Sequence, residues 1–213
     1  ENRGYLKRLR GGAISVKSKV GNESRFEKRR AINLDKKTQI AKYAASLVNS
    51  GDCIGIDVGS TTFEFAHQIK GINNLTVITA SIPVLIELVD VPNISLISTG
   101  GEVSSLDQSL TGHNAIRTIN EYVLDKVFLG VAGISLMYGY TLFNMRDTLI
   151  KRALIERAEE IIVLADSSKF GVTRHAFFAE INRVDKIITD SGVEPDYISN
   201  LESKGVEVIV IDN

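Results

Sequence analysis

The sequence predicts an α/β fold in which a mostly parallel sheet carries helices on both faces. Short apolar segments rich in β-branched residues alternate along the chain with segments of helical periodicity. Segments that are apolar throughout are typical of strands buried on both faces of a parallel sheet. Only residues 101–111 interrupt the alternation, and they indicate a small excursion from the sheet. The strands are expected at residues 53–56, 75–79, 94–98, 127–131, 161–165, 186–189 and 206–211.

Helices between these strands follow from apolar residues at helical spacing. The first begins near Asp35 and ends before Gly51, because glycine breaks a helix. Two shorter helices are expected at residues 62–69 and 83–89, the second with proline near its first turn. The clearest amphipathic pattern predicts a helix at residues 146–160. Its inward side chains are expected to be Leu149, Ile150, Ala153, Leu154 and Ala158.

The composition is that of a globular protein. Hydrophobic residues make up 44% and charged residues 24% of the 213 positions, near the globular average. No apolar run approaches the roughly 18 residues that a membrane-spanning helix needs. Cys53 is the only cysteine, so no internal disulfide can form, and no secretory signal is visible. We therefore expect a cytoplasmic protein with no membrane contact.

Charge is distributed unevenly along the chain. Residues 1–42 contain 13 Lys and Arg against 4 Asp and Glu, whereas the other residues contain 12 against 22. We interpret residues 1–33 as a basic leader, with one short pairing strand at 13–16, and residues 34–213 as the folded domain. A basic leader on an acidic body is either a solvated arm or a segment that lies beside an anion such as nucleic acid.

The strongest local signal is the turn after the first expected strand, Asp57-Val58-Gly59-Ser60-Thr61-Thr62. A buried strand leads there into small hydroxyl residues that open a helix. The N-terminus of a helix offers unpaired N–H groups and a positive dipole, which suit a phosphate. The same turn is equally well explained as an ordinary helix cap made by Ser60 or Thr61. Its spacing matches neither the Walker loop nor the dinucleotide fingerprint.

Other expected strand ends are also polar or flexible. They are Thr79, Gly100-Gly101, residues 130–133 and residues 166–169. Ligands bind outside the carboxyl ends of the strands in open α/β sheets, so this recurrence indicates a pocket there. Lys151 and Lys169 are the cations suited to a phosphate, although spacing alone favours a helix pair between Lys151 and Asp147. The spacing of histidine and cysteine predicts no metal site.

Several motifs occur in order along the whole chain. They are Gly11-Gly12-Ala13, Lys37-x-x-Ile40-Ala41, Gly51-Asp52, Asp57-x-Gly59-Ser60-Thr61-Thr62, Gly100-Gly101, Lys151, Asp166-Ser167-Ser168-Lys169-Phe170-Gly171 and Ile188-Thr189-Asp190. In combination they resemble the effector-binding domain of DeoR-type bacterial transcriptional repressors. The resemblance implies a fold similar to that of ribose-5-phosphate isomerases and coenzyme A transferases. It also implies that a winged helix-turn-helix, missing from this chain, contacts the operator DNA.

The resemblance further implies a phosphorylated sugar as effector, bound at the strand ends of a homo-oligomer. It places Lys151 in the pocket rather than in a helix pair. No cofactor and no metal are expected, and a helical face at residues 116–122 is the expected oligomer contact. The expected ligand-binding residues are Asp57, Gly59, Ser60, Thr61, Thr62, Thr79, Gly100, Gly101, Lys151 and Lys169.

Two enzyme classes compete with this interpretation. A sugar-phosphate isomerase fits the fold, but residues 130–133 lack the carboxylates that such enzymes carry after the fourth strand. An actin-like sugar kinase fits the turn at residues 55–62, but that motif normally starts the chain and a second nucleotide domain follows it. We therefore predict a domain that binds its ligand without turnover, not an enzyme.

Overall fold

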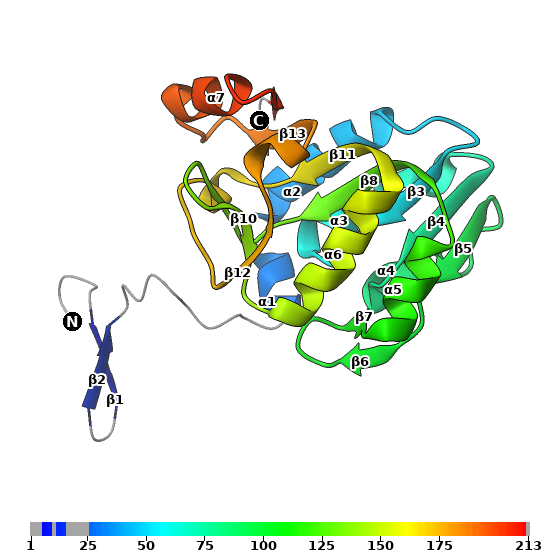
Figure 1. Cartoon of the computed structure of the whole chain (residues 1–213), viewed down its shortest axis with the longest axis horizontal. Helices are drawn as coiled ribbons and strands as arrows, with labels where there is room; N and C mark the ends of the chain where they lie inside the picture. Colours follow the sequence, from blue (N-terminus) through cyan, green and yellow to red (C-terminus); the bar gives the residue numbers. More distant parts are fainter. Residues whose placement is uncertain (1–5, 10–11, 16–25, 212–213) are drawn as a thin grey trace.

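The computed structural model describes residues 6–9, 12–15 and 26–211, and a seven-stranded sheet forms its centre (Figure 1). Every pair of neighbouring strands in this sheet runs parallel. The order across the sheet is β14 (Glu207–Ile211), β13 (Lys186–Asp190), β11 (Ala158–Leu164), β8 (Leu124–Gly130), β3 (Cys53–Ile56), β4 (Leu75–Thr79) and β5 (Ile94–Ser98). The predicted fold class and the predicted strands are confirmed.

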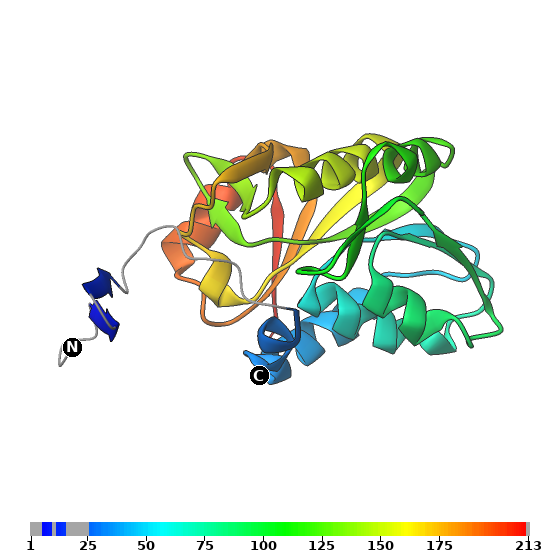
Figure 2. The ribbon, with the colours of Figure 1, turned by 90° about the horizontal axis from the view of Figure 1, so that it is seen from below.

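Helices cover both faces of the sheet, as the turned view in Figure 2 shows. One face carries α2 (Leu34–Ser46), α3 (Ser60–Gln68) and α4 (Ile82–Leu88), and the other carries α5 (His113–Asn120), α6 (Met145–Arg157) and α7 (Pro195–Glu202). Within β8, Phe128 packs into the first helical layer while Val127 and Leu129 pack into the second. Successive side chains of a strand point to opposite faces of the sheet, so a strand that is apolar throughout contributes side chains to the hydrophobic core on each face.

The chain reverses its direction across the sheet between β3 and β8. From β3 it proceeds outward through β4 to β5, and from β8 it proceeds the other way through β11 and β13 to β14. A backbone hydrogen bond from the Asp57 N–H to the Phe128 carbonyl (3.0 Å) joins the two strands at their carboxyl ends. Loops leave in opposite directions at such a switch point and open a crevice between them.

Among the described residues, three smaller sheets lie outside the central one. The excursion expected at residues 101–111 is a hairpin of β6 (Glu102–Ser104) and β7 (Ser109–Thr111). An antiparallel sheet of β9 (Gly133–Ser135), β10 (Gly139–Leu142) and β12 (Ala176–Ala179) was not predicted. Near the start of the chain β1 (Leu6–Leu9) pairs with β2 (Gly12–Ser15), which contains most of the strand expected at 13–16; residue 16 lies outside the described residues. Short 3₁₀ turns complete the fold at η1 (Ile69–Gly71), η2 (Ser167–Lys169) and η3 (Ile181–Arg183).

The first described helix is α1 (Phe26–Ala31), which lies before the helix start near Asp35 that periodicity predicts. Phe26 is 2% exposed and meets the Phe63 ring edge-on, with centroids 5.9 Å apart. Arg30 lies 4.2 Å over the same ring and pairs with Glu64 at 3.2 Å. One aromatic anchor and one ion pair therefore attach α1 to α3.

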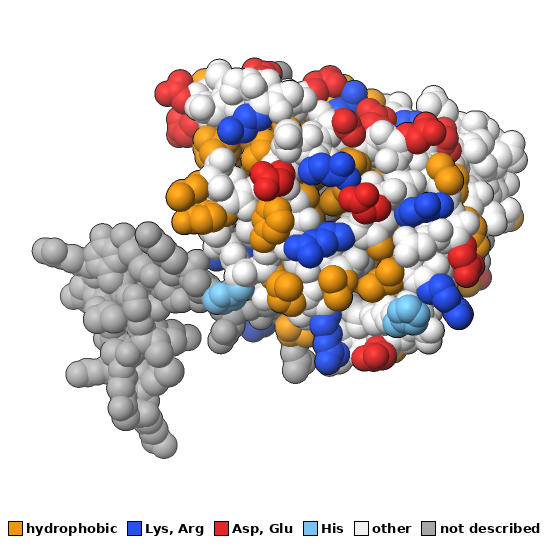
Figure 3. Space-filling view, viewed as in Figure 1, with side chains coloured by type: hydrophobic (Ala, Val, Ile, Leu, Met, Phe, Trp, Pro, Cys, Tyr) orange, Lys and Arg blue, Asp and Glu red, His pale blue; other side chains and the backbone are white. Residues whose placement is uncertain are grey.

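The helix expected at residues 146–160 is shorter in the structure. α6 ends at Arg157, and residues 158–160 belong to β11, because Ala158 and Glu160 pair with Leu124 and Lys126 of β8. The expected inward position of Leu149 is wrong, since this side chain is 47% exposed. Figure 3 shows other hydrophobic side chains on the same face, around α6 and the β10–β12 region. The exposed set includes Met137, Tyr138, Met145, Leu149 and Phe177.

Candidate functional site

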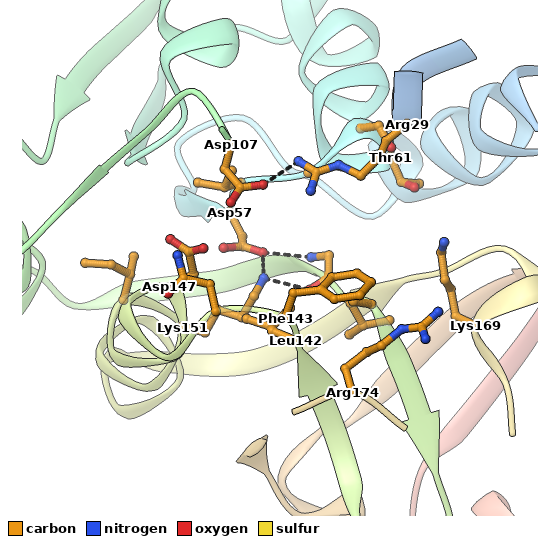
Figure 4. A pocket seen from close by; sticks show the side chains of 18 of the residues that line it. Arg29, Asp57, Thr61, Asp107, Leu142, Phe143, Asp147, Lys151, Lys169 and Arg174 are labelled. Carbon is orange, nitrogen blue, oxygen red and sulfur yellow. Dashed lines mark hydrogen bonds and ion pairs between the residues drawn. The ribbon is translucent and has the colours of Figure 1, made fainter. Parts of the chain in front are cut away.

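A cavity of about 310 Å³ opens at the carboxyl ends of β3 and β8, at the switch point of the sheet (Figure 4). The turn after β3 supplies Asp57 to Thr61 and the loop after β8 supplies Gly130 to Ala132. Helices α1, α2 and α6, the β6–β7 hairpin and the segments after β10 and β11 supply the other walls. Its volume lies at the lower end of the range for small-molecule pockets, so the cavity suits a compact ligand.

The floor of the cavity is an ion pair between Asp57 and Lys151, which are 2% and 3% exposed. The Lys151 ammonium donates to Asp57 Oδ2 and to the Gly130 carbonyl at 2.7 Å. The Gly130 N–H in turn donates to Asp57 Oδ2 at 2.9 Å. One lysine thus holds the turns after β3 and β8 together, and its charge is already balanced by the Asp57 carboxylate.

The N-terminus of α3 faces the cavity. Gly59 is the N-cap residue and no side chain caps the helix, so the alternative that Ser60 or Thr61 is an ordinary cap does not hold. The first intrahelical bond runs from the Phe63 N–H to the Gly59 carbonyl at 3.0 Å, which leaves the preceding N–H groups unused by the helix. A side chain at Gly59 would come within 3.0 Å of Thr62 Oγ1, so the close turn suits glycine.

Two lysines line the cavity near one another. Lys37 is 3% exposed, and its ammonium donates to the carbonyls of Arg29 and Ile32 at the end of α1. Burial lowers the pKa of Lys37 to about 8; the charge of Asp166 opposes this effect and the charge of Lys169 adds to it. The Lys169 ammonium has no hydrogen bond or ion pair within the described residues, so it is available to an anion.

Two arginines complete the positive lining. Arg29 pairs with Asp107 at 2.6 Å, and Arg174 lies 4.8 Å from the centre of the Phe143 ring. Figure 4 shows Lys169 and Arg174 at one end of the cavity and Asp57, Asp107 and Asp147 at the other. The cavity therefore has a basic end and an acidic end.

Asp107 and Asp147 are close neighbours at the acidic end. Burial raises the pKa of Asp147 to about 7, and the charge of Asp107 adds to this effect while Lys151 opposes it. A side-chain hydrogen bond between Asp147 and Asp107 raises this pKa further. Apart from that bond, Asp107 Oδ2 and Asp147 Oδ1 are buried and meet no donor within the described part of the chain.

The structure brings six of the ten expected ligand-binding residues to the cavity. They are Asp57, Gly59, Ser60, Thr61, Lys151 and Lys169. Thr62 does not line it, because its hydroxyl donates to the carbonyls of Asp57 and Gly59 at 2.8 and 3.0 Å. Thr79 is fully buried and donates to the Ile56 carbonyl at 2.6 Å. Gly100 and Gly101 shape the turn into β6 instead, both with positive φ.

Several lining residues are not among the expected ligand-binding residues. They are Arg29, Lys37, Asp107, Asp147, Arg174 and Asp166, the last of which belongs to a strand end that was expected at the pocket. Arg29 was counted in the leader, and Asp147 was considered only as a helix partner of Lys151. The sequence pattern could have indicated Lys37, because this charged residue lies on the apolar face of α2, where Ile40, Ala41 and Ala44 are also buried.

The chain was compared with protein-family models and with known proteins. Residues 32–191 match the model of the DeoR C-terminal sensor domain. The chain belongs to the DeoR family. Among curated relatives, the uncharacterized HTH-type transcriptional regulator YulB of Bacillus subtilis is 38% identical over 97% of this chain and 79% of its own length. The putative aga operon transcriptional repressor of Escherichia coli O157:H7 is 33% identical over 99% of this chain and 79% of its own length. The HTH-type transcriptional repressor GlcR of Bacillus subtilis is 33% identical over 100% of this chain and 81% of its own length.

Two solved structures are similar to part of this DeoR-type sensor domain. Eukaryotic initiation factor 2B beta from Chaetomium thermophilum superposes with a TM-score of 0.50 at 16% identity, over 72% of this chain and 48% of that one. Ribose 5-phosphate isomerase A from Methanocaldococcus jannaschii reaches a TM-score of 0.48 at 22% identity, over 65% and 55%. At 16% identity the match to the initiation factor concerns the fold alone.

The predicted membership and regulatory class are confirmed: the chain is a ligand-sensing domain of a DeoR-type regulator. The curated relatives named above are transcriptional regulators by name. Across the described residues, no helix has the length and apolar character needed to span a bilayer. Within the same residues no group of three or more His, Cys, Asp or Glu side chains is arranged to hold a metal ion.

Proposed function

We propose that this sensor domain binds a phosphorylated sugar and reports its presence to an operator-binding domain. The observation that carries the proposal is that the N-terminus of α3, which has no side-chain cap, opens into the same cavity as the ammonium of Lys169, which has no partner among the described residues. Unused N–H groups at a helix N-terminus favour a phosphate, and an ammonium adds a charge-assisted hydrogen bond. The phosphate would be held by the backbone of residues 59–61 and by Lys169.

The charges around the cavity support a phosphate at the basic end. Lys151 is neutralised by Asp57, and Arg29 pairs with Asp107. Lys169 has no such carboxylate partner within the described residues, and burial has already lowered the pKa of the neighbouring Lys37. A phosphate dianion placed there would stabilise the charged form of both lysines.

An isomerase-like enzyme is the less favoured alternative. Gly130, Val131 and Ala132 line the cavity and carry no acid or base. Asp57, the carboxylate nearest to this loop, is held by Lys151 and the Gly130 N–H and so is poorly placed to move a proton. We propose that the ligand is released unchanged.

Transmission to DNA requires a second domain. We propose a winged helix-turn-helix before residue 1, acting in the bacterial cytoplasm, where a ligand shifts the equilibrium between arrangements of the protein. Homo-oligomerisation is part of this proposal, because two DNA-binding domains held together in an oligomer can contact the two repeated half-sites of an operator. Ile116 and Tyr122, on the face expected to form the contact, instead pack against the core. The exposed side chains Met145, Leu149 and Phe177 are the better candidates.

The test is a calorimetric titration of this chain with a panel of sugar phosphates, each paired with its unphosphorylated sugar. We expect at least one phosphorylated member to bind and its unphosphorylated counterpart not to bind. A ligand at a hundred times its Kd should also stabilise the fold by about 2.7 kcal/mol in thermal denaturation. Equal binding of a sugar with and without phosphate would contradict the proposal, and conversion of the ligand during incubation would support the isomerase alternative.

A further inference from the structure

Helix α1 contributes to the cavity and also lies between the sensor domain and the N-terminal part of the chain. Arg29 of α1 and Ile32, just after it, line the cavity. The operator-binding domain is proposed to precede residue 1, so the chain connects it to the sensor domain through α1. A change in how α1 docks would therefore reach the connection to the DNA-binding domain directly.

Few contacts hold α1 in place. On the side of α3, Phe26 and Arg30 supply one aromatic contact and one ion pair. On the side of the cavity, the Arg29 guanidinium pairs with Asp107 at 2.6 Å, as Figure 4 shows. A helix of six residues is not stable by itself, so these contacts decide whether α1 is docked. Segments held in this way open locally at a lower free energy than the whole domain unfolds.

Lys37 of α2 connects α1 to the cavity. Its ammonium donates to the carbonyls of Arg29 and Ile32, at the C-terminal end of α1, where the helix dipole favours a cation. An ammonium has three N–H donors, and the third meets no acceptor within the described residues. Because Lys37 also lines the cavity, an anion bound there can accept this third hydrogen bond. One ammonium would then hold the anion and α1 together.

The turn between α1 and α2 is also attached to the cavity wall. Asn33 has a φ of +54°, a left-handed conformation that asparagine adopts more readily than most residues. Its side-chain amide donates to Asp166 Oδ1 at 3.1 Å, and Asp166 lines the cavity. Three lining residues, Lys37, Asp107 and Asp166, thus hold α1 or the turn after it. A ligand among these residues acts on the docking of α1 without any intermediate element.

The charge of Lys37 is sensitive to an anion in the cavity. Burial lowers the pKa of Lys37 to about 8; the charge of Asp166 opposes this effect and the charge of Lys169 adds to it. An anion bound beside Lys37 favours the charged ammonium. A charged ammonium donates stronger hydrogen bonds to carbonyl groups than a neutral amine does. The anion therefore strengthens the two hydrogen bonds that Lys37 makes to α1.

We infer that α1 docks more tightly when an anion occupies the cavity, and that Lys37 is the positioning residue that transmits this occupancy to α1. This inference rests on the proposed function and names the regulation of its site. Linkage makes the effect reciprocal, so release of α1 must weaken the binding of the anion by the same factor. Such couplings between sites are typically about 5- to 150-fold.

The first experiment measures hydrogen exchange in α1 with inorganic phosphate as the probe, because phosphate is the part of the proposed ligand that would meet Lys37. Phosphorus NMR titration sets the concentration that fills the site, and sodium chloride at equal ionic strength is the reference. We expect residues 27–31 to exchange about fivefold more slowly, or slower still, when phosphate is bound. Protection in β8 should not change.

A lysine variant tests the route of the coupling. Lys37→Met should abolish the phosphate-dependent protection of residues 27–31, even at a phosphate concentration that fills the site of the variant. Lys42→Met is the matched control, since Lys42 is an exposed lysine of the same helix and does not line the cavity. It should keep the full effect. A merely structural role of Lys37 would change the exchange of α1 equally with and without phosphate.

The reciprocal experiment acts on α1 from outside the cavity. Phe26 does not line the cavity, and Phe26→Ala should release α1. The variant should bind phosphate more weakly, by the factor with which phosphate protects α1 in the wild type. Exchange in α3 checks that the helix carrying Phe63 stays intact, and Glu27→Ala, at an exposed position of α1, should leave the affinity unchanged. This experiment decides the matter if Lys37→Met fails to fold.

The outcomes separate the two proposals. If phosphate fills the site and the exchange of α1 stays the same or becomes faster, the coupling is wrong while phosphate binding stands. The coupling is equally wrong if Phe26→Ala releases α1 and leaves the phosphate affinity unchanged. If phosphate protects α1 as well in Lys37→Met as in the wild type, Lys37 is not the transmitting residue. If neither inorganic phosphate nor any sugar phosphate binds, the proposed function itself fails and the coupling fails with it.

Discussion

Lys151 and Asp57 are 94 positions apart in sequence and form a buried ion pair between α6 and the turn after β3. The Lys151 side chain is 3% exposed, so water has little access to the ion pair. The Lys151 ammonium also donates a hydrogen bond to the Gly130 carbonyl at 2.7 Å. The pair therefore joins the two strand ends between which the cavity opens. Its contribution is structural as well as electrostatic.

Lys151→Met should destabilise the fold by about 3–5 kcal/mol, because it leaves the Asp57 carboxylate buried without its cation. The double variant Asp57→Asn with Lys151→Met should recover part of this loss, since no charge then stays buried and Gly130 can still donate to the amide oxygen. Urea denaturation of the two variants and the wild type measures the difference. A double variant less stable than the single one would show that the charge is not the cause.

Lys169→Ala should weaken the preferred phosphate ester roughly ten- to a hundredfold, which corresponds to the about 1.5–3 kcal/mol of a hydrogen bond to a charged group. Ser60→Ala should cost less, because a neutral hydroxyl contributes only about 0.5–1.5 kcal/mol. Lys204→Ala, which removes an exposed lysine after α7, is the matched control for the change in net charge. Calorimetry should find no loss for the control. An equal loss in both lysine variants would point to a general charge effect.

Phe26→Ala should release α1 without unfolding the domain. Phe26 is the buried anchor of a six-residue helix, and its ring meets Phe63 edge-on. Loss of such an aromatic contact costs about 3–5 kcal/mol where the site cannot collapse, more than a short helix can restore. Hydrogen exchange should show lost protection in residues 27–31 and unchanged protection in β8. Glu27→Ala, at an exposed position of the same helix, should leave both unchanged; a uniform loss across the domain would contradict a local role.

Asp147→Asn should alter how stability depends on pH. Burial raises the pKa of Asp147 to about 7 in the folded chain, against about 3.9 for an unfolded aspartate. The folded state therefore binds the proton on Asp147 more tightly than the unfolded state does. Protonated Asp147 adds to the free energy of unfolding fully below about pH 4, and this contribution is lost as the pH rises through about 7. The variant should gain stability relative to wild type between pH 5 and pH 8. Urea midpoints at intermediate pH values test this, and a constant difference across the range would refute it.

Gly101→Ala should destabilise the protein more than Gly100→Ala. Both glycines have positive φ, +64° at Gly100 and +107° at Gly101, where an L side chain is strained by about 1–2 kcal/mol. A Cβ at Gly100 meets nothing within 4 Å, whereas one at Gly101 would lie 2.3 Å from the Thr111 carbonyl oxygen in β7. The second substitution must shift the β6–β7 hairpin, which carries Asp107 between its strands. Thermal denaturation ranks the two, and equal melting temperatures would exclude the backbone clash.

The sequence by itself determined the sheet and the turn that leads from β3 into α3, because both depend on local patterns. Apolar β-branched segments are buried wherever a parallel sheet forms, so β3, β4 and β5 lie at the predicted residues. Glycine followed by hydroxyl residues after a buried strand indicated the N-terminus of α3 for the same local reason. Periodicity failed at residues 158–160, where pairing with β8 extends β11 at the expense of the helix.

Only the tertiary structure decided which side chains share the cavity. Arg29 reaches it because Phe26 anchors α1, and Asp107 reaches it because the β6–β7 hairpin folds back over the strand ends. Thr79 lies at a strand end as predicted, yet its hydroxyl donates a hydrogen bond to the Ile56 carbonyl of the neighbouring strand β3 and does not reach the cavity. Which side chains reach the cavity depends on contacts between residues far apart in the chain. Those contacts form only when the whole core packs, so a local sequence pattern does not predict them.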